Sequence, residues 1–287
     1  MSGGEKTALE SIIKMKNMSR RRFFKRAARK MLFSEWTMQI FAFVVVGAFF
    51  VGMNYFGTSV GLVLKQLTDS FVLLSIAIYF FAIFALALGV PMLYGLFSFE
   101  INALLKENCN LSDIFCVFSD KLRLFRCYAV FFRVLFKCIL CFAPAFLVLG
   151  LGKNYLADEY FGMFTVGNVD VASFVINTVF VVLAYLGIVL SSGTVVGIFI
   201  SVTREDLSVD DCFFVARKCI RNSRFELGKM TLSFLPLFVV SLFSIGFLFV
   251  LYTLPYMLIT GVMFSKYLYD KYNFEIQMKI GNDIAGN

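Results

Sequence analysis

Long apolar stretches alternate with short polar breaks along most of this 287-residue chain. The stretches cover residues 36–56, 71–99, 128–150, 171–202 and 231–269, and most charged residues lie outside them. A helix needs about 20 apolar residues to cross the hydrocarbon core of a bilayer. The pattern therefore predicts an all-α, polytopic helical membrane protein.

The last apolar stretch, 231–269, is too long for one crossing. As a single straight helix it would reach about 58 Å, roughly twice the thickness of the hydrocarbon core. Proline cannot continue an interior hydrogen-bond ladder, so we expect the chain to reverse at 252–256, around Pro255. Spans near 231–252 and 255–269 result. The prediction is six transmembrane helices, arranged as three hairpins.

The distribution of Lys and Arg predicts the orientation of the spans. These residues are concentrated in the N-terminal region, in the breaks 100–126 and 203–230, and in the C-terminal tail, whereas the other breaks contain only Lys65 and Lys153. Positive residues favour the cytoplasmic side, so both termini are expected in the cytoplasm. The predicted parts are a basic cytoplasmic region, 1–35, a six-span membrane domain, 36–272, and a short cytoplasmic tail, 273–287.

Composition agrees with this class of protein. Sixty per cent of the residues are hydrophobic, 37 are Phe, and 16% are charged, and the mean hydropathy is +0.82. A soluble domain of this size would expose large apolar patches. The net charge of +8 comes largely from residues before the first span.

Each cytoplasmic segment contains a stretch typical of an amphipathic helix at the membrane surface. The stretches begin at a possible helix cap, Ser19, Ser112 or Ser208, and repeat apolar residues at helical spacing. Each even-numbered span also ends in a glycine followed by a serine, at 95–98, 197–201 and 261–265. These repeated features predict three units, each a surface helix followed by a hairpin. The alternative is that interfacial helices resemble one another through composition alone.

The first of these helices is strongly basic. Near a membrane surface each Lys or Arg is worth about 1 kcal/mol against anionic lipid, and an acidic protein partner is the alternative. Nucleic acid is not expected, because Phe23 and Phe24 share the helix and a span follows it. The candidate contacts are Arg20, Arg21, Arg22, Lys25, Arg26, Arg29 and Lys30.

Arg133 and Lys137 are basic residues inside an apolar stretch, one helical turn apart. A cation at membrane depth marks a functional site by default. Snorkelling toward the cytoplasm, or pairing with Glu100 or a lipid phosphate, is the alternative. We include both as candidate contacts for anionic lipid or a partner, and Gly193 and Gly197, a GxxxG pair, as candidates for helix packing.

The sequence contains little that could catalyse a reaction. It has no histidine, which excludes His-based acid–base chemistry and His-ligated metal. Cys138 and Cys141 form a CxxC inside a span, where packing is a commoner role than redox chemistry or metal binding. There is no paired acid and base, phosphate loop or metal-ligand spacing. We therefore expect no enzyme, no catalytic residue, no cofactor and no metal.

Three groups of residues resemble a known family. They are the basic helix 25–32 with Trp36, the stretch 89–95 continuing through 104–106 to 111–118, and 232–234 with Gly246 and 255–256 in the last hairpin. The chain resembles an uncharacterised bacterial family of six-span integral membrane proteins, distantly similar to the membrane region of some glycerophosphodiester phosphodiesterases. It departs from that pattern, because a Pro-Gly turn after the third span and a tryptophan after 232–234 are missing. The resemblance implies a six-span fold in a bacterial cytoplasmic membrane.

Two functions agree best with these features. The first is a non-enzymatic accessory protein that binds membrane lipids, preferentially anionic ones, and a membrane-protein partner or a second copy of itself. The second is a small transporter or permease subunit with a cavity between the hairpins, suggested by the four prolines in the apolar stretches. A membrane-embedded lipid enzyme is the third and weakest hypothesis.

Overall fold

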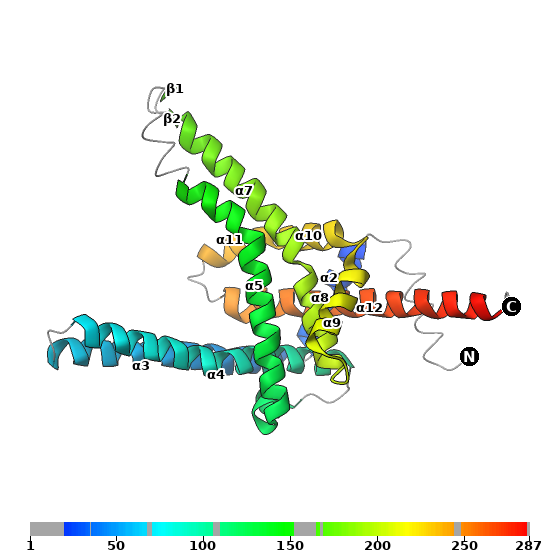
Figure 1. Cartoon of the computed structure of the whole chain (residues 1–287), viewed down its shortest axis with the longest axis horizontal. Coiled ribbons are helices and arrows are strands. Elements are labelled where there is room, and N and C mark those ends of the chain that lie inside the picture. The colour runs from blue at the N-terminus through cyan, green and yellow to red at the C-terminus, as the bar shows by residue number, and fades with distance from the viewer. Residues whose placement is uncertain are drawn as a thin grey trace. The chain divides into compact units, whose positions relative to one another are not determined.

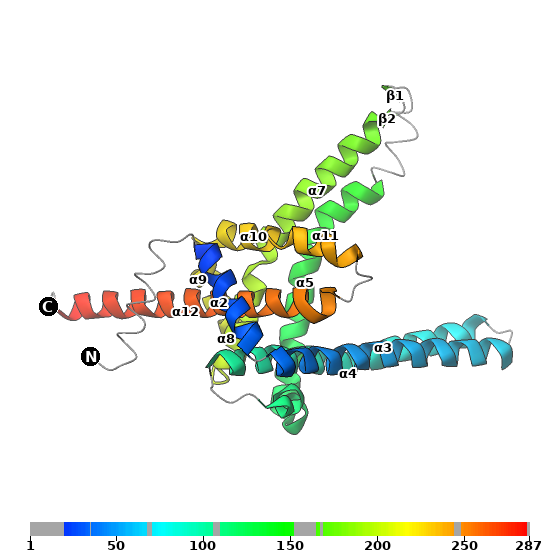
Figure 2. The same ribbon diagram turned by 180° about the vertical axis from the view of Figure 1, so that it is seen from behind.

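The computed structural model describes residues 20–34, 36–67, 71–105, 110–151, 165–166, 169–243 and 248–285 (Figure 1; Figure 2). In chain order the elements are α2 (Arg20–Ser34), α3 (Trp36–Leu67), α4 (Phe71–Leu105), the 3₁₀ helix η1 (Leu111–Ser119), α5 (Lys121–Leu151), β1 (Thr165–Val166), β2 (Val169–Asp170), α7 (Val171–Ser191), α8 (Gly193–Thr203), α9 (Val209–Ile220), α10 (Arg224–Leu232), α11 (Leu235–Phe243), the π-helix η3 (Phe249–Thr253) and α12 (Leu254–Ala285). β1 and β2 form one short antiparallel pair. The predicted helical class is confirmed.

Four helical segments of the described chain are long and apolar enough to cross a membrane. They are Trp36–Gln66, Ile78–Leu105, Lys121–Leu151 and Phe174–Thr203. Each corresponds to one of the first four predicted spans. Most of each segment is not buried against the rest of the protein, as expected for helices whose apolar side chains face lipid. The protein is therefore a candidate for membrane insertion through these four helices.

The last apolar stretch differs from its prediction. The predicted span 231–252 is divided between α10, which ends at Leu232, and α11, which begins at Leu235 with Pro236 as its second residue. Proline suits the first turn of a helix, where its missing N–H group would have no partner.

The predicted reversal at 252–256 is wrong. η3 continues directly into α12, and Pro255 is the second residue of α12. A proline ring clashes with the carbonyl group of the preceding helical turn. The π-helical turn of η3 is wider than an α-helical turn and so leaves room for the ring of Pro255. α11 packs beside η3, and the hydroxyls of Ser241 and Thr253 lie 2.9 Å apart.

The described chain forms two compact units. Unit 1 consists of Met1–Tyr128 and Ser233–Asn287, and unit 2 of Ala129–Leu232. In unit 1, α3 and α4 lie side by side along their length (Figure 1; Figure 2). A buried cluster joins one end of this hairpin to η1, with α12 packed against it. Its buried members are Ala42, Phe43, Val46, Met92, Leu96, Phe99 and Ile114.

In unit 2, α9 folds back against α8, and α10 packs on α7. Gly228 of α10 makes the second contact possible, since a Cβ there would lie 2.6 Å from Val189. Around Ser192, α7 gives way to α8. The hydroxyls of Ser192 and Thr194 each donate to a carbonyl three residues earlier, at 2.6 Å. Such back-bonding often bends helices.

The surface helices share a mode of packing. η1 lies on Gly95 of α4, where a Cβ would be 2.7 Å from the Ile114 carbonyl carbon, and α9 lies on Gly197 of α8, where a Cβ would be 2.6 Å from the Phe213 ring. α2 packs on α12, with the rings of Phe24 and Phe264 5.4 Å apart. Each surface helix thus packs on a helix that carries one of the repeated glycine–serine sequences. The arrangement of six spans as three hairpins stays a prediction.

The second surface helix differs in detail from the expectation. It is a 3₁₀ helix that begins at Leu111, with Asn110 rather than Ser112 at the N-cap position and no side-chain cap hydrogen bond there, and it ends at Ser119. Asp120 then starts α5, because its carboxylate accepts a hydrogen bond from the Leu122 N–H at 3.0 Å. α5 therefore begins at Lys121 and not near 128. The third surface helix does begin at its predicted cap, since the Ser208 hydroxyl accepts the N–H of Asp211 at 3.2 Å.

Candidate anion-binding site

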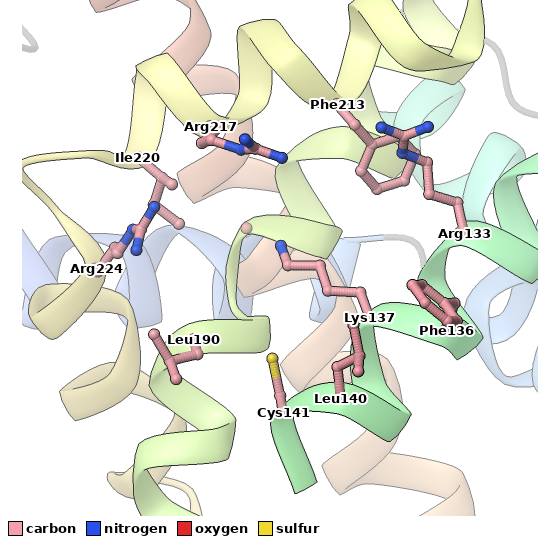
Figure 3. Close-up of a pocket in the computed structure, with 11 residues that line it drawn as sticks. Arg133, Phe136, Lys137, Leu140, Cys141, Leu190, Phe213, Arg217, Ile220 and Arg224 are labelled. Atoms are coloured by element: carbon pink, nitrogen blue, oxygen red, sulfur yellow. The ribbon is translucent and has the colours of Figure 1, made fainter. Parts of the chain in front are cut away.

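Unit 2 contains a cavity of about 680 Å³ into which several basic side chains project (Figure 3). α5 forms one side, the bend between α7 and α8 a second, and α9 with the start of α10 a third. The lining residues are Arg133, Phe136, Lys137, Leu140, Cys141, Leu190, Gly193, Phe213, Arg217, Ile220 and Arg224. The volume lies within the range typical of small-molecule sites.

Four of the lining residues are cationic, and none is acidic. Arg133 and Lys137 are four residues apart on α5, so they share one face of that helix. Arg217 lies in the last turn of α9, and Arg224 is the first residue of α10. Figure 3 shows Lys137 reaching from α5 toward α9, with Arg217 and Arg224 on the far side of the space.

Arg133 is held in place by two contacts. Its guanidinium forms an ion pair with the carboxylate of Asp210 in the first turn of α9, and it lies 5.5 Å from the centroid of the Phe213 ring. Both side chains of the ion pair are substantially exposed, so its contribution to stability is at most about 1 kcal/mol. Arg133 thus pairs with Asp210, an acid of its own unit.

The other three cations have no such partner. Among the described residues, no carboxylate pairs with Lys137, Arg217 or Arg224. Their like charges repel one another around a shared cavity with apolar walls, and a bound anion would relieve that repulsion. This arrangement can bind an anion.

Gly193 gives Lys137 the room it needs. A Cβ at residue 193 would lie 3.3 Å from the Lys137 ammonium nitrogen and 3.5 Å from Ile220. A longer side chain at 193 would therefore compete with the ammonium group for the cavity. The two glycines predicted to pack helices thus lie in different places, Gly197 against the Phe213 ring and Gly193 beside the cation.

The apolar part of the lining is open at the protein surface. Phe136 is 65% exposed, Leu140 59% and Leu190 49%. All three belong to membrane-length helices, whereas Phe213 and Ile220 are buried. The cavity therefore combines a cationic inner part with an apolar rim, an arrangement that suits an amphiphilic anion.

The basic residues of α2 belong to unit 1, whereas the cavity belongs to unit 2. Lys25 is directed inward, since its ammonium donates to the Ser233 carbonyl at 3.0 Å and lies 4.2 Å from the centroid of the Phe234 ring. It is less available to an external anion than expected. Arg22, Arg26, Arg29 and Lys30 are exposed, and the side chains of Arg20 and Arg21 lie outside the described residues.

Sequence reasoning identified half of the cationic cluster. Arg133 and Lys137 drew attention because they interrupt an apolar stretch. Arg217 and Arg224 were counted only as cytoplasmic charge, because nothing in their local sequence shows that they face α5. Within the described part of the chain no group of acidic and cysteine side chains has the arrangement of a metal site. Cys138 and Cys141 are free thiols, and Cys141 lines the cavity.

Comparison with known proteins does not add to this description. No family model, no curated protein and no solved structure matches the chain. The site therefore rests on its own geometry.

Proposed function

We propose that this chain is a non-enzymatic integral protein of a bacterial cytoplasmic membrane that binds an anionic lipid in the cavity of unit 2. The observation that supports this proposal is the cluster of four cations around one space, in which Asp210 is the one acid among the described residues that forms an ion pair. The cations are Arg133, Lys137, Arg217 and Arg224. In this proposal the cavity lies toward the cytoplasmic side, where α9 rests on the inner leaflet.

The depth of the cluster supports a lipid ligand. Arg133 lies 12 residues into α5, or about 18 Å along the helix. Part of that length, from Lys121 to Arg126, is basic and belongs to the interface. Arg133 lies about 10 Å, and Lys137 about 16 Å, further along the helix than Arg126. Their side chains would therefore extend toward the cytoplasm to meet the phosphate of a lipid. The exposed basic face of α2 adds attraction to an anionic leaflet.

Transport is the second candidate function. The observation that favours it is the bend at Ser192, which lies beside the cavity in a membrane-length segment. Broken or bent helices often line the substrate sites of transporters. Under this reading the same cations would hold an anionic substrate, and the bend would let one side of the cavity open. Phosphate or organic-anion flux into proteoliposomes would favour transport over lipid binding alone.

The first test is the lipid content of the protein taken from its native membrane. The tagged chain would be extracted with its surrounding lipid, and the lipids counted by mass spectrometry. Enrichment of anionic lipid over the bulk membrane is expected, and the double variant Lys137→Gln with Arg217→Gln should lose it. The matched control, Lys218→Gln with Arg221→Gln, removes the same charge from exposed positions outside the cavity. Equal lipid content in both double variants would contradict the proposal. A stoichiometric protein found with the chain would identify the partner.

A further inference from the structure

We infer that the ligand of this cavity is a lipid whose headgroup ends in a phosphate monoester or diphosphate, rather than an ordinary phosphodiester lipid. The inference rests on the proposed function and specifies the chemical class of its ligand. It follows from the charge, the donor geometry and the apolar rim of the cavity.

Charge is the first consideration. Asp210 offsets Arg133, which leaves Lys137, Arg217 and Arg224 uncompensated among the described residues. A phosphodiester lipid without other charges carries a single negative charge and would leave two of the three cations unbalanced. A zwitterionic headgroup would also bring its own cation among them. A terminal phosphate carries about 1.5 to 2 negative charges at pH 7, and a diphosphate carries more.

The placement of the donors is the second consideration. Lys137 approaches from α5, while Arg217 and Arg224 approach from α9 and α10 (Figure 3). A terminal phosphate has three free oxygens that can accept charge-assisted hydrogen bonds from several directions. A phosphodiester has two, and its second ester substituent would have to fit among the cations. Gly193 adds no side chain of its own to the space beside the Lys137 ammonium.

The apolar rim indicates a lipid rather than a water-soluble phosphate. A phosphate group is much smaller than the 680 Å³ cavity, so most of the space is left for the remainder of the ligand. That remainder would contact Phe136, Leu140 and Leu190, whose exposed faces belong to membrane-length helices. A hydrocarbon chain can leave the cavity past these residues without contact with water.

The inference can be tested on the full chain in lipid nanodiscs of defined composition at pH 7.5. The discs would contain equal amounts of phosphatidic acid, phosphatidylglycerol and phosphatidylcholine, and native mass spectrometry would count the lipids retained by the released protein. We expect phosphatidic acid to be retained at least tenfold over phosphatidylglycerol. At pH 5 its phosphate carries about one charge, because its second pKa is near 6, so the preference should fall several-fold.

Variants separate the site from general surface charge. Arg217→Gln with Arg224→Gln should remove the preference for phosphatidic acid, while Lys218→Gln with Arg221→Gln should keep it. Thermal unfolding would show that both proteins are folded. Asp210→Asn removes an acid from the edge of the cavity and should strengthen the preference, so the site can be tested even if the double arginine variant does not fold.

Each contrary result has a distinct meaning. Equal retention of phosphatidic acid and phosphatidylglycerol, both lost in the Arg217/Arg224 variant, would overturn the inference and leave the proposed function standing. Retention of no anionic lipid over phosphatidylcholine would overturn both. Displacement of the lipid by millimolar inorganic phosphate or pyrophosphate would show that the site recognises a soluble phosphate, and would overturn the assignment to a lipid.

Discussion

Alanine in place of Gly95 would put a methyl group into the contact between α4 and η1. Its Cβ would lie 2.7 Å from the Ile114 carbonyl carbon, whereas ordinary van der Waals contact begins at 3.4 Å. The Ile114 carbonyl oxygen lies closer still to this position. The obstacle is backbone, which cannot rotate away as a side chain can, so η1 must withdraw by more than the 0.7 Å that separates the carbonyl carbon from ordinary contact. This movement disturbs the burial of Ile114 and Val117, each 1% exposed.

The size of the effect follows from two opposing terms. Overpacking a buried contact costs about 1–3 kcal/mol, and alanine returns about 0.5–1 kcal/mol through its better helix propensity. The expected net loss is about 1–2 kcal/mol. Full detachment of η1 would expose both apolar side chains and sets an upper limit of roughly 3–6 kcal/mol.

Thermal unfolding of the purified variant would measure this loss, and hydrogen exchange would show whether residues of η1 open. The control is Gly52→Ala, since Gly52 lies within α3 and its Cβ would meet nothing within 4 Å. That substitution should stabilise the protein by about 0.5–1 kcal/mol. The two alanines are therefore expected to act with opposite signs. If Gly95→Ala were as stable as Gly52→Ala, with unchanged exchange in η1, the described contact between α4 and η1 would be refuted.

Three further substitutions test other contacts. Gly197→Ala should destabilise the protein by less than about 1 kcal/mol in the same unfolding assay. The new Cβ would meet the edge of the Phe213 ring, which can rotate, rather than a backbone atom. A loss above about 3 kcal/mol would contradict this. Asp210→Asn should raise retention of phosphatidic acid about two- to fivefold by releasing Arg133, and reduced retention would count against the site. Gln39→Leu should raise the unfolding midpoint. The fully buried amide of Gln39 has no hydrogen-bond partner among the described residues, and its burial costs about 1–3 kcal/mol. A lower midpoint would show that Gln39 has a polar role.

Local features of the chain were predicted with fair accuracy. The first four apolar stretches became membrane-length helices, and Ser208 begins α9 as expected. Both depend on residues close in sequence, a run long enough to span the core in one case and a hydroxyl within reach of an N–H in the other. The start of α5 was missed for a similarly local reason, because Asp120 caps a helix that begins in a basic segment.

Tertiary contacts decided the remaining features. In the last apolar stretch α11 packs beside η3, and the helix continues through Pro255, where a reversal was expected. Lys25 was expected to face lipid and instead lies over the Phe234 ring, a contact between residues far apart in the sequence.

The sequence by itself determined the class of this protein, because hydrophobicity summed over about 20 residues is enough to favour a helix across a membrane. It also determined where positive charge lies along the chain. Only the tertiary structure decided that Arg217 and Arg224 join Lys137 around one cavity. That meeting depends on how α9 lies against α8, through the close approach at Gly197, and on the room left beside Gly193. Such contacts arise from the fit of surfaces distant in sequence, which no local pattern records.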